Sequence, residues 1–248
     1  QKTALNNLSL TLNAGDFVTV IGGNGAGKST LLNAIAGVWK PDCGQIIIDG
    51  DDVTNTPEHK RAKYLGRVFQ DPMRGTAASM EIAENLALAA RRGQSRTLKW
   101  GVKKSEKEFY REKLADLDLG LEDRLTSKVG LLSGGQRQAL TLLMASLKTP
   151  KVLLLDEHTA ALDPKTAAKV LELTDRIVNE NKLTTLMITH NMHDAITHGN
   201  RLIMLSNGQV MLDIKGEEKQ HLTVEKLLSK FYQASGEDFA DDSVLLSK

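Results

Sequence analysis

Cysteine, long apolar runs and a surplus of charge of either sign are scarce in this sequence of 248 residues. A single cysteine, Cys43, excludes a disulfide framework and suits a reducing compartment. No stretch approaches the roughly 20 consecutive apolar residues that cross a bilayer, so a membrane role would be peripheral. Lysine and arginine number 32 against 31 aspartate and glutamate residues, and this balance argues against a nucleic-acid binder.

Short apolar segments alternate with helical patterns over most of the chain. Continuous apolar runs at residues 152–155, 185–188 and 202–205 are typical of strands in a parallel sheet that is covered on both faces. Residues 5–21 alternate apolar and polar positions around a turn, so we expect an antiparallel hairpin there. Residues 71–149 are instead rich in helix-forming residues.

The sequence therefore predicts one discontinuous α/β domain. Its core comprises residues 1–70 and 150–215, and residues 71–149 form an inserted helical subdomain. Residues 216–248 are expected to form a C-terminal helix and an acidic, disordered tail.

A glycine-rich loop joins the apolar segment that ends at Ile21 to a helical segment. Residues 22–29 read GGNGAGKS and fit the pattern G-x4-G-K-[ST], with a strand before and a helix after. Such a loop turns backbone N–H groups toward an anion, and the following helix aims its positive end at the same place. The alternative is a glycine-rich turn with a surface lysine. We favour a P-loop NTPase (RecA-like) core that binds nucleotide through Gly22, Gly23, Asn24, Gly25, Ala26, Gly27, Lys28, Ser29 and Thr30.

Two adjacent carboxylates, Asp156 and Glu157, follow the apolar run VLLL. In P-loop proteins a second buried strand ends in an aspartate that holds Mg²⁺ directly or through water, and we assign this role to Asp156. Glu157 is placed to orient and deprotonate the attacking water. The alternative is that one of the two carboxylates caps the next helix.

Residues 132–136 read LSGGQ, within the predicted helical insertion. With the phosphate loop and VLLLDE, this motif makes the chain resemble the ATP-binding subunits of ABC transporters over essentially its whole length. The resemblance implies that Gln70 senses Mg²⁺ and the attacking water, that residues 161–163 form the D-loop, and that His190 contacts the γ-phosphate. The implied catalytic residues are Glu157, His190 and Lys28; the implied Mg²⁺ residues are Ser29, Gln70 and Asp156; and the implied signature contacts to ATP are Ser133, Gly134, Gly135 and Gln136.

The resemblance also implies an assembly. Two copies would close head to tail as a homodimer, with each ATP between one copy's phosphate loop and the other copy's LSGGQ, so a monomer would hydrolyse ATP weakly. A single ATPase domain without a membrane span implies separate integral-membrane permease subunits and a place on the cytoplasmic face of the cell membrane. Permease contacts would fall within residues 71–80, on Met73, Arg74 and Met80.

Within this family, the chain resembles one group of ATPases in particular. Segments such as VIGGNGAGKSTLLNAIAG and LLLDEHTAALDP look most like ATPases of bacterial uptake systems with a separate substrate-binding lipoprotein, which take up tryptophan, tyrosine or similar small solutes. The alternatives are an exporter ATPase, a soluble ABC ATPase of DNA repair or translation, and a non-hydrolysing ATP-gated module. The repair and translation proteins carry a coiled-coil insertion or a second ATPase domain, and neither is present in the sequence.

Two departures from the family pattern stand out. The aromatic residue that stacks on adenine has no match ahead of the phosphate loop, and we expect it in a segment preceding Gln1. His158 stands where most members have proline, and it is either a second proton acceptor or the start of the next loop. Because Glu157 fills the role of base, we predict a neighbour and not a catalyst. His190, His193 and His198 match no standard zinc spacing, so we predict no metal there.

Overall fold

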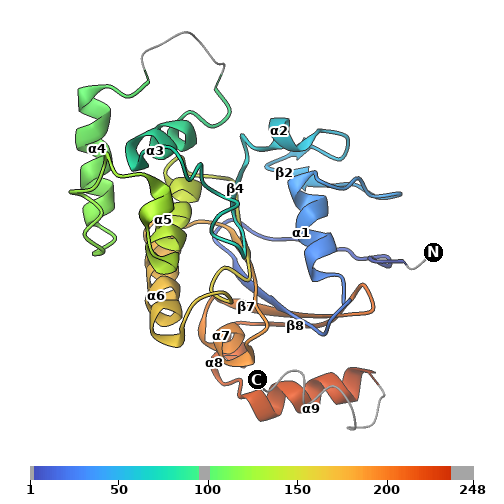
Figure 1. The fold of residues 1–248 in the computed structure, drawn as a ribbon. Coiled ribbons are helices and arrows are strands. Elements are labelled where there is room, and N and C mark those ends of the chain that lie inside the picture. The colour runs from blue at the N-terminus through green and yellow to red at the C-terminus, as the bar shows by residue number, and fades with distance from the viewer. Residues whose placement is uncertain (1–2, 95–100, 236–248) are drawn as a thin grey trace. The chain divides into compact units, whose positions relative to one another are not determined.

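The computed structural model describes residues 3–94 and 101–235, so the acidic tail predicted at the C-terminus lies outside the described residues (Figure 1). The chain forms two compact units, and we describe each by itself. Unit 1 comprises Gln1–Asn55 and Lys182–Lys248, and unit 2 comprises Thr56–Asn181. These bounds differ from those of the predicted core and insertion, and that division stays a prediction.

Unit 1 is built on a sheet with strand order β6–β1–β7–β8. β1 pairs in parallel with β6 on one side and with β7 on the other, and β8 is antiparallel to β7. All five residues of β1, FVTVI, are buried, as expected of a central strand rich in β-branched residues. The elements of unit 1 are β1 (Phe17–Ile21), α1 (Lys28–Ala36), β2 (Ile47–Ile48), β3 (Asp51–Asp52), β6 (Thr185–Ile188), α7 (Met192–Thr197), β7 (Arg201–Ser206), β8 (Gln209–Lys215), α8 (Glu217–Gln220) and α9 (Val224–Ser235).

An apolar cluster holds the C-terminal elements of unit 1 together. Ile21, Leu202 and Ile214 from the sheet pack with Met192 of α7 and Leu227 of α9. Helix α9 lies along β8 (Figure 1). The C-terminal helix predicted from the sequence therefore exists and is part of the unit's core.

The antiparallel hairpin of the N-terminal region lies at residues 47–52, where β2 pairs with β3, and not at residues 5–21. Among the described residues, 3–16 contain no strand. The segment is instead held by the Asn6 amide, which donates to the carbonyl oxygen of Gly208 at 2.9 Å, and by the Arg201 guanidinium, which donates to the carbonyl oxygen of Thr11 at 2.7 Å. Alternation in a sequence indicates an extended segment without naming its partner.

In its described residues, unit 2 combines a parallel strand pair, β4 and β5, with four longer helices. Helices α5 and α6 pack against each other, and α3 and α4 lie beside α5 (Figure 1). The elements of unit 2 are α2 (Glu58–Arg61), β4 (Leu65–Val68), α3 (Ile82–Ala90), α4 (Lys104–Ala115), the 3-10 helix η1 (Val129–Leu131), α5 (Gly134–Ser146), β5 (Val152–Asp156) and α6 (Pro164–Glu180). Within the described ranges, no helix is long and apolar enough to cross a membrane.

Helix α6 shows how the sequence positions these elements. Asp163 caps its start by accepting the Thr166 amide at 3.1 Å, and Pro164 occupies the first turn, where a missing N–H costs nothing. Buried residues then recur at helical spacing along one face: Val170, Leu171, Leu173, Thr174, Ile177 and Val178.

Candidate functional site

The phosphate loop leaves β1 at Ile21 and enters α1 at Lys28. Gly22 has φ 153°, and a Cβ there would lie 2.3 Å from the carbonyl oxygen of Leu205 on β7. Gly27 is the N-cap of α1 with φ 103°, and its Cβ would lie 2.7 Å from the carbonyl oxygen of Ala4. Glycine is therefore required at both ends of the loop, by backbone conformation and by space.

Helix α1 begins without a capping side chain. Its first helical bond runs from the Leu31 amide to the Gly27 carbonyl oxygen at 2.8 Å, so the amides of the first turn precede the helix's own hydrogen-bond ladder. Lys28 is buried, and its Nζ donates to the carbonyl oxygens of Gly22 at 2.6 Å and Gly23 at 3.1 Å. The loop thus offers an anion a positive charge and the positive end of a helix.

His190 lies at the same edge of the unit 1 sheet as the phosphate loop. The Thr189 amide donates to the carbonyl oxygen of Val20 at 3.2 Å, which places the end of β6 beside the end of β1. Asn191 caps α7 directly afterwards by accepting the amides of His193 and Asp194. His190 is therefore an exposed side chain on a backbone that is held on both sides.

In unit 2, the parallel strands β4 and β5 bring Gln70 to Glu157. Val68 pairs with Leu155, so the residues that follow each strand leave the same edge. The Gln70 amide Nε2 donates to Glu157 Oε2 at 3.2 Å. Glu157 has φ 46°, a left-handed conformation that is uncommon for a residue with a long side chain. Unusual backbone of this kind gathers at functional sites.

Asp156 forms an ion pair that the sequence analysis did not predict. Arg67 Nη2 lies 3.5 Å from Asp156 Oδ2, and the guanidinium also lies over the Phe69 ring, 4.6 Å from its centroid. Burial lowers the pKa of Arg67, and the charge of Asp156 opposes that shift. The sequence could have indicated this ion pair, because Arg67 lies inside an apolar strand. A charge that is buried in this way needs a partner of opposite charge.

The signature residues begin helix α5. Ser133 is the N-cap: its hydroxyl accepts the Gln136 amide at 3.2 Å, and Gln136 Oε1 accepts the Ser133 amide at 3.2 Å. This reciprocal arrangement is a capping box. Gly135 packs against α6, where a Cβ would lie 2.2 Å from Cγ2 of Thr166. The second glycine of the motif therefore allows close helix packing within unit 2.

His158 is neither exposed nor turned toward solvent. It is 2% exposed, and its Nε2 lies 3.0 Å from the Thr174 hydroxyl on the buried face of α6. His158 does begin the turn that follows β5, and in addition its side chain is buried and hydrogen-bonded, which the sequence analysis did not predict. Its absence from catalysis stays a prediction.

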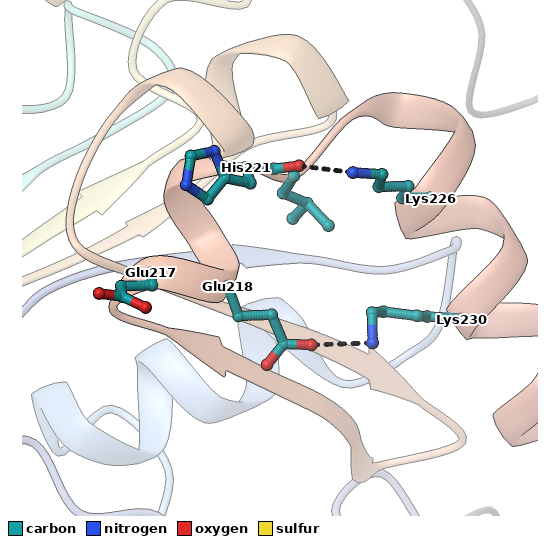
Figure 2. Close-up of a pocket in the computed structure, with 6 residues that line it drawn as sticks. Glu217, Glu218, His221, Lys226 and Lys230 are labelled. Carbon is teal, nitrogen blue, oxygen red and sulfur yellow. Dashed lines mark hydrogen bonds and ion pairs between the residues drawn. The ribbon is translucent and has the colours of Figure 1, made fainter.

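A cavity of about 360 Å³ lies on unit 1, and none of the predicted site residues lines it (Figure 2). It is lined by α8, α9 and the turn between them. Lys226 Nζ donates to the His221 carbonyl oxygen at 3.2 Å, and Lys230 Nζ pairs with Glu218 at 2.8 Å. Since both lysines are paired within the cavity wall, we assign no ligand to it.

The predicted site residues divide between the units. Unit 1 brings Gly22–Thr30 and His190 to one edge of its own strands, unit 2 brings Gln70, Asp156 and Glu157 together where β4 and β5 end, and LSGGQ opens α5. The predicted Mg²⁺ residues, Ser29, Gln70 and Asp156, supply a hydroxyl, an amide oxygen and a carboxylate, and this all-oxygen donor set suits Mg²⁺. Among the described residues, no group of three or more His, Cys, Asp or Glu side chains is arranged to hold a metal ion.

Comparison with known sequences identifies relatives. Residues 5–160 match the family described as ABC transporter. The chain is 52% identical over 232 residues to the tyrosine transport ATP-binding protein of Clostridioides difficile, covering 94% of this chain and 92% of that protein. It is 34% identical over 213 residues to the spermidine/putrescine import ATP-binding protein PotA of Haemophilus influenzae, covering 85% of this chain but only 54% of that protein, so the chain spans about half of that relative.

Solved structures agree with the sequence relatives. The ATP-binding cassette MJ0796, in a dimeric post-hydrolysis state bound to ADP and Pi, superposes with a TM-score of 0.71 at 30% identity over 86% of this chain and 90% of that chain. The ADP conformation of the cassette MJ1267 superposes with a TM-score of 0.74 at 28% identity over 93% of this chain and 92% of that chain. The chain belongs to the ABC transporter family, as an ATP-hydrolysing ATP-binding cassette.

Proposed function

We propose that the chain is the ATPase subunit of a bacterial importer for tyrosine or a closely related small amino acid. The observation that carries the substrate class is the 52% identity to a tyrosine transport ATP-binding protein, which extends over 94% of this chain. Polyamine and methionine import proteins among the more distant relatives support import as the direction.

The chemistry follows from the two groups of residues. Lys28 and the first amides of α1 hold the phosphates, and His190 contacts the outermost phosphate from the same sheet edge. Glu157 accepts a proton from the attacking water, and the Gln70 amide that bonds to it at 3.2 Å holds the carboxylate in place. Mg²⁺, held by Ser29, Gln70 and Asp156, would neutralise charge on the phosphate oxygens.

Each cassette supplies half of each complete site. Gly134 and Gly135 begin a helix of 13 residues whose first amides can hold an anion together with the Ser133 hydroxyl. We therefore assign this helix end to the ATP of a second copy in a head-to-tail homodimer. The dimeric state of the MJ0796 cassette supports this assignment.

The permease is proposed to contact residues 71–80 of unit 2. Met73 and Arg74 are exposed, whereas Met80 is half-buried. Met73 also contacts the guanidinium of Arg137, and Arg137 donates to the carbonyl oxygens of Gly130 and Leu132 just ahead of the signature. A permease that contacts Met73 would therefore be linked, through Arg137, to the segment that precedes α5. The cassette would work at the cytoplasmic face of the membrane, with a substrate-binding lipoprotein on the other side.

The proposal is tested by measuring uptake of radiolabelled tyrosine in cells of the source organism from which the gene for this chain has been deleted. Wild-type chain should restore uptake, and Lys28→Ala should not, because it removes the charge beside the phosphate loop. Lys169→Ala, an exposed lysine on α6, is the matched control and should restore uptake. Two results would contradict the assigned substrate. One is tyrosine uptake that is unchanged when the cells lack the chain. The other is that these cells lose uptake of labelled spermidine and keep uptake of tyrosine.

A further inference from the structure

Glu157 adopts a backbone conformation that residues with a side chain rarely adopt. Its φ of 46° lies in the left-handed region, where the Cβ of an L-residue crowds the following carbonyl oxygen. Its carbonyl oxygen accepts the Ala160 amide at 3.0 Å, so the chain reverses immediately after β5. The direction of the Glu157 carboxylate, which receives the Gln70 amide, depends on this turn being kept.

The next residue is fixed from inside the protein. His158 is 2% exposed, and Thr174, which it contacts, is 1% exposed. The Thr174 hydroxyl donates its one proton to the carbonyl oxygen of Val170 at 2.8 Å. It must therefore accept from His158, so the imidazole carries a proton on Nε2 and donates it across 3.0 Å.

The anchor for this bond is rigid. Helix α6 has 17 residues, is capped by Asp163, and buries Val170 and Thr174 among its core-facing residues. A side chain tied to such a helix cannot follow a relaxation of the turn without breaking a buried hydrogen bond.

We propose that His158 is a positioning residue, whose buried hydrogen bond to Thr174 holds Glu157 in the left-handed turn that aims its carboxylate at the Gln70 amide and the attacking water. This inference rests on the proposed role of Glu157 as the base. In this role His158 acts through Glu157 and not on the reacting atoms.

The test compares His158→Phe, which keeps a buried ring and loses the donor, with His158→Gln, which keeps an N–H donor of similar reach. ATP turnover and binding of a fluorescent ATP analogue are measured on the purified chain. His158→Phe should lower kcat about tenfold or more, because small misplacements of reacting groups are costly. KM and nucleotide affinity should stay within about twofold, since the phosphate loop is untouched, and His158→Gln should recover most of kcat.

Thr174→Val provides the second arm, since it removes the acceptor and keeps the shape of the side chain. It should lower kcat to a similar degree, and combining it with His158→Phe should cause little further loss of kcat, because both changes remove the same hydrogen bond between His158 and Thr174. Full kcat in a folded His158→Phe or Thr174→Val protein would overturn the inference, as would a failure of His158→Gln to recover kcat. Glu157→Gln separates the two claims: if it hydrolyses ATP normally, the base assignment itself fails.

Discussion

The ion pair between Arg67 and Asp156 is the residue-scale feature with the clearest electrostatic consequence. The two side chains are only 14% and 19% exposed, so solvent screens their interaction weakly. Asp156 is the carboxylate proposed to hold a divalent cation. A fixed positive charge next to that carboxylate repels a second cation, so Arg67 should weaken metal affinity while it keeps Asp156 in place.

Replacing Arg67 with methionine should therefore strengthen binding of Mn²⁺ in the presence of a non-hydrolysable ATP analogue. The expected gain is on the order of tenfold, from the removal of one unit charge a few ångströms from the ion. Electron paramagnetic resonance of free Mn²⁺ measures this directly. Arg67→Lys keeps the charge and should bind Mn²⁺ like the wild type. Equal affinity in the methionine variant would show that Arg67 does not oppose the metal.

At the scale of elements, helices α5 and α6 meet through a contact that leaves no room for a methyl group. A Cβ on Gly135 would lie 2.2 Å from Thr166 Cγ2, whereas a Cβ on Gly134 would lie 3.3 Å from a flexible Leu162 side-chain carbon. The signature glycines therefore differ in their structural demand, although both belong to one motif.

Gly135→Ala should destabilise the protein by about 1–3 kcal/mol, as overpacking does in well-packed contacts. Denaturant unfolding measures the loss, and Gly134→Ala is the matched control with a smaller expected effect. Thr166→Ser removes the methyl group that clashes and should restore stability in the Gly135→Ala background. If the serine gives no recovery, the packing explanation is wrong.

The hairpin of β7 and β8 is joined by a two-pronged ion pair. Arg201 Nε and Nη2 each lie 2.7 Å from an oxygen of Asp213. The hydrogen bonds from Arg201 hold the pKa of Asp213 below its usual range. A carboxyl group whose pKa falls on folding stabilises the protein above its unfolded pKa, about 3.9, and this contribution disappears as the pH falls through the folded pKa.

Asp213→Asn should therefore lower the melting temperature at pH 7 by about 2–4 °C, a modest loss because the carboxylate is partly exposed. The difference from the wild type should begin to shrink below about pH 4, where the unfolded chain takes up the proton, and should disappear as the pH falls through the lower folded pKa. Asp42→Asn, in an exposed loop of unit 1, serves as the control. A difference that is the same at pH 3 and pH 7 would exclude an ionic contribution.

Elements were more predictable than the contacts between them. The strand, glycine loop and helix at residues 17–36 follow from local chemistry, and so do the apolar strands that end at Asp156 and Ile188. The burial of His158 was not predictable, because it depends on a hydroxyl 16 residues away on α6. Residues 5–13 show the same limit: their apolar and polar positions alternate, but the groups that hold them, the Gly208 carbonyl oxygen and the Arg201 side chain, are distant in sequence.

At the scale of the whole molecule, the central claim is that hydrolysis needs two copies. The phosphate loop and His190 lie in unit 1, and the proposed base and the signature helix lie in unit 2. The anion-binding end of α5 is assigned to the nucleotide of a second copy, so ATP should join two chains and its hydrolysis should release them. Blocking the proposed base should therefore trap the joined form.

The most direct measurement is the mass of Glu157→Gln protein by light scattering, in Mg²⁺ with ATP or with ADP. The account predicts a dimer in ATP and a monomer in ADP, whereas Glu172→Gln, an exposed glutamate on α6, should return to monomer as it consumes its ATP. A Glu157→Gln protein that binds ATP and stays monomeric would contradict the ATP-driven head-to-tail dimer.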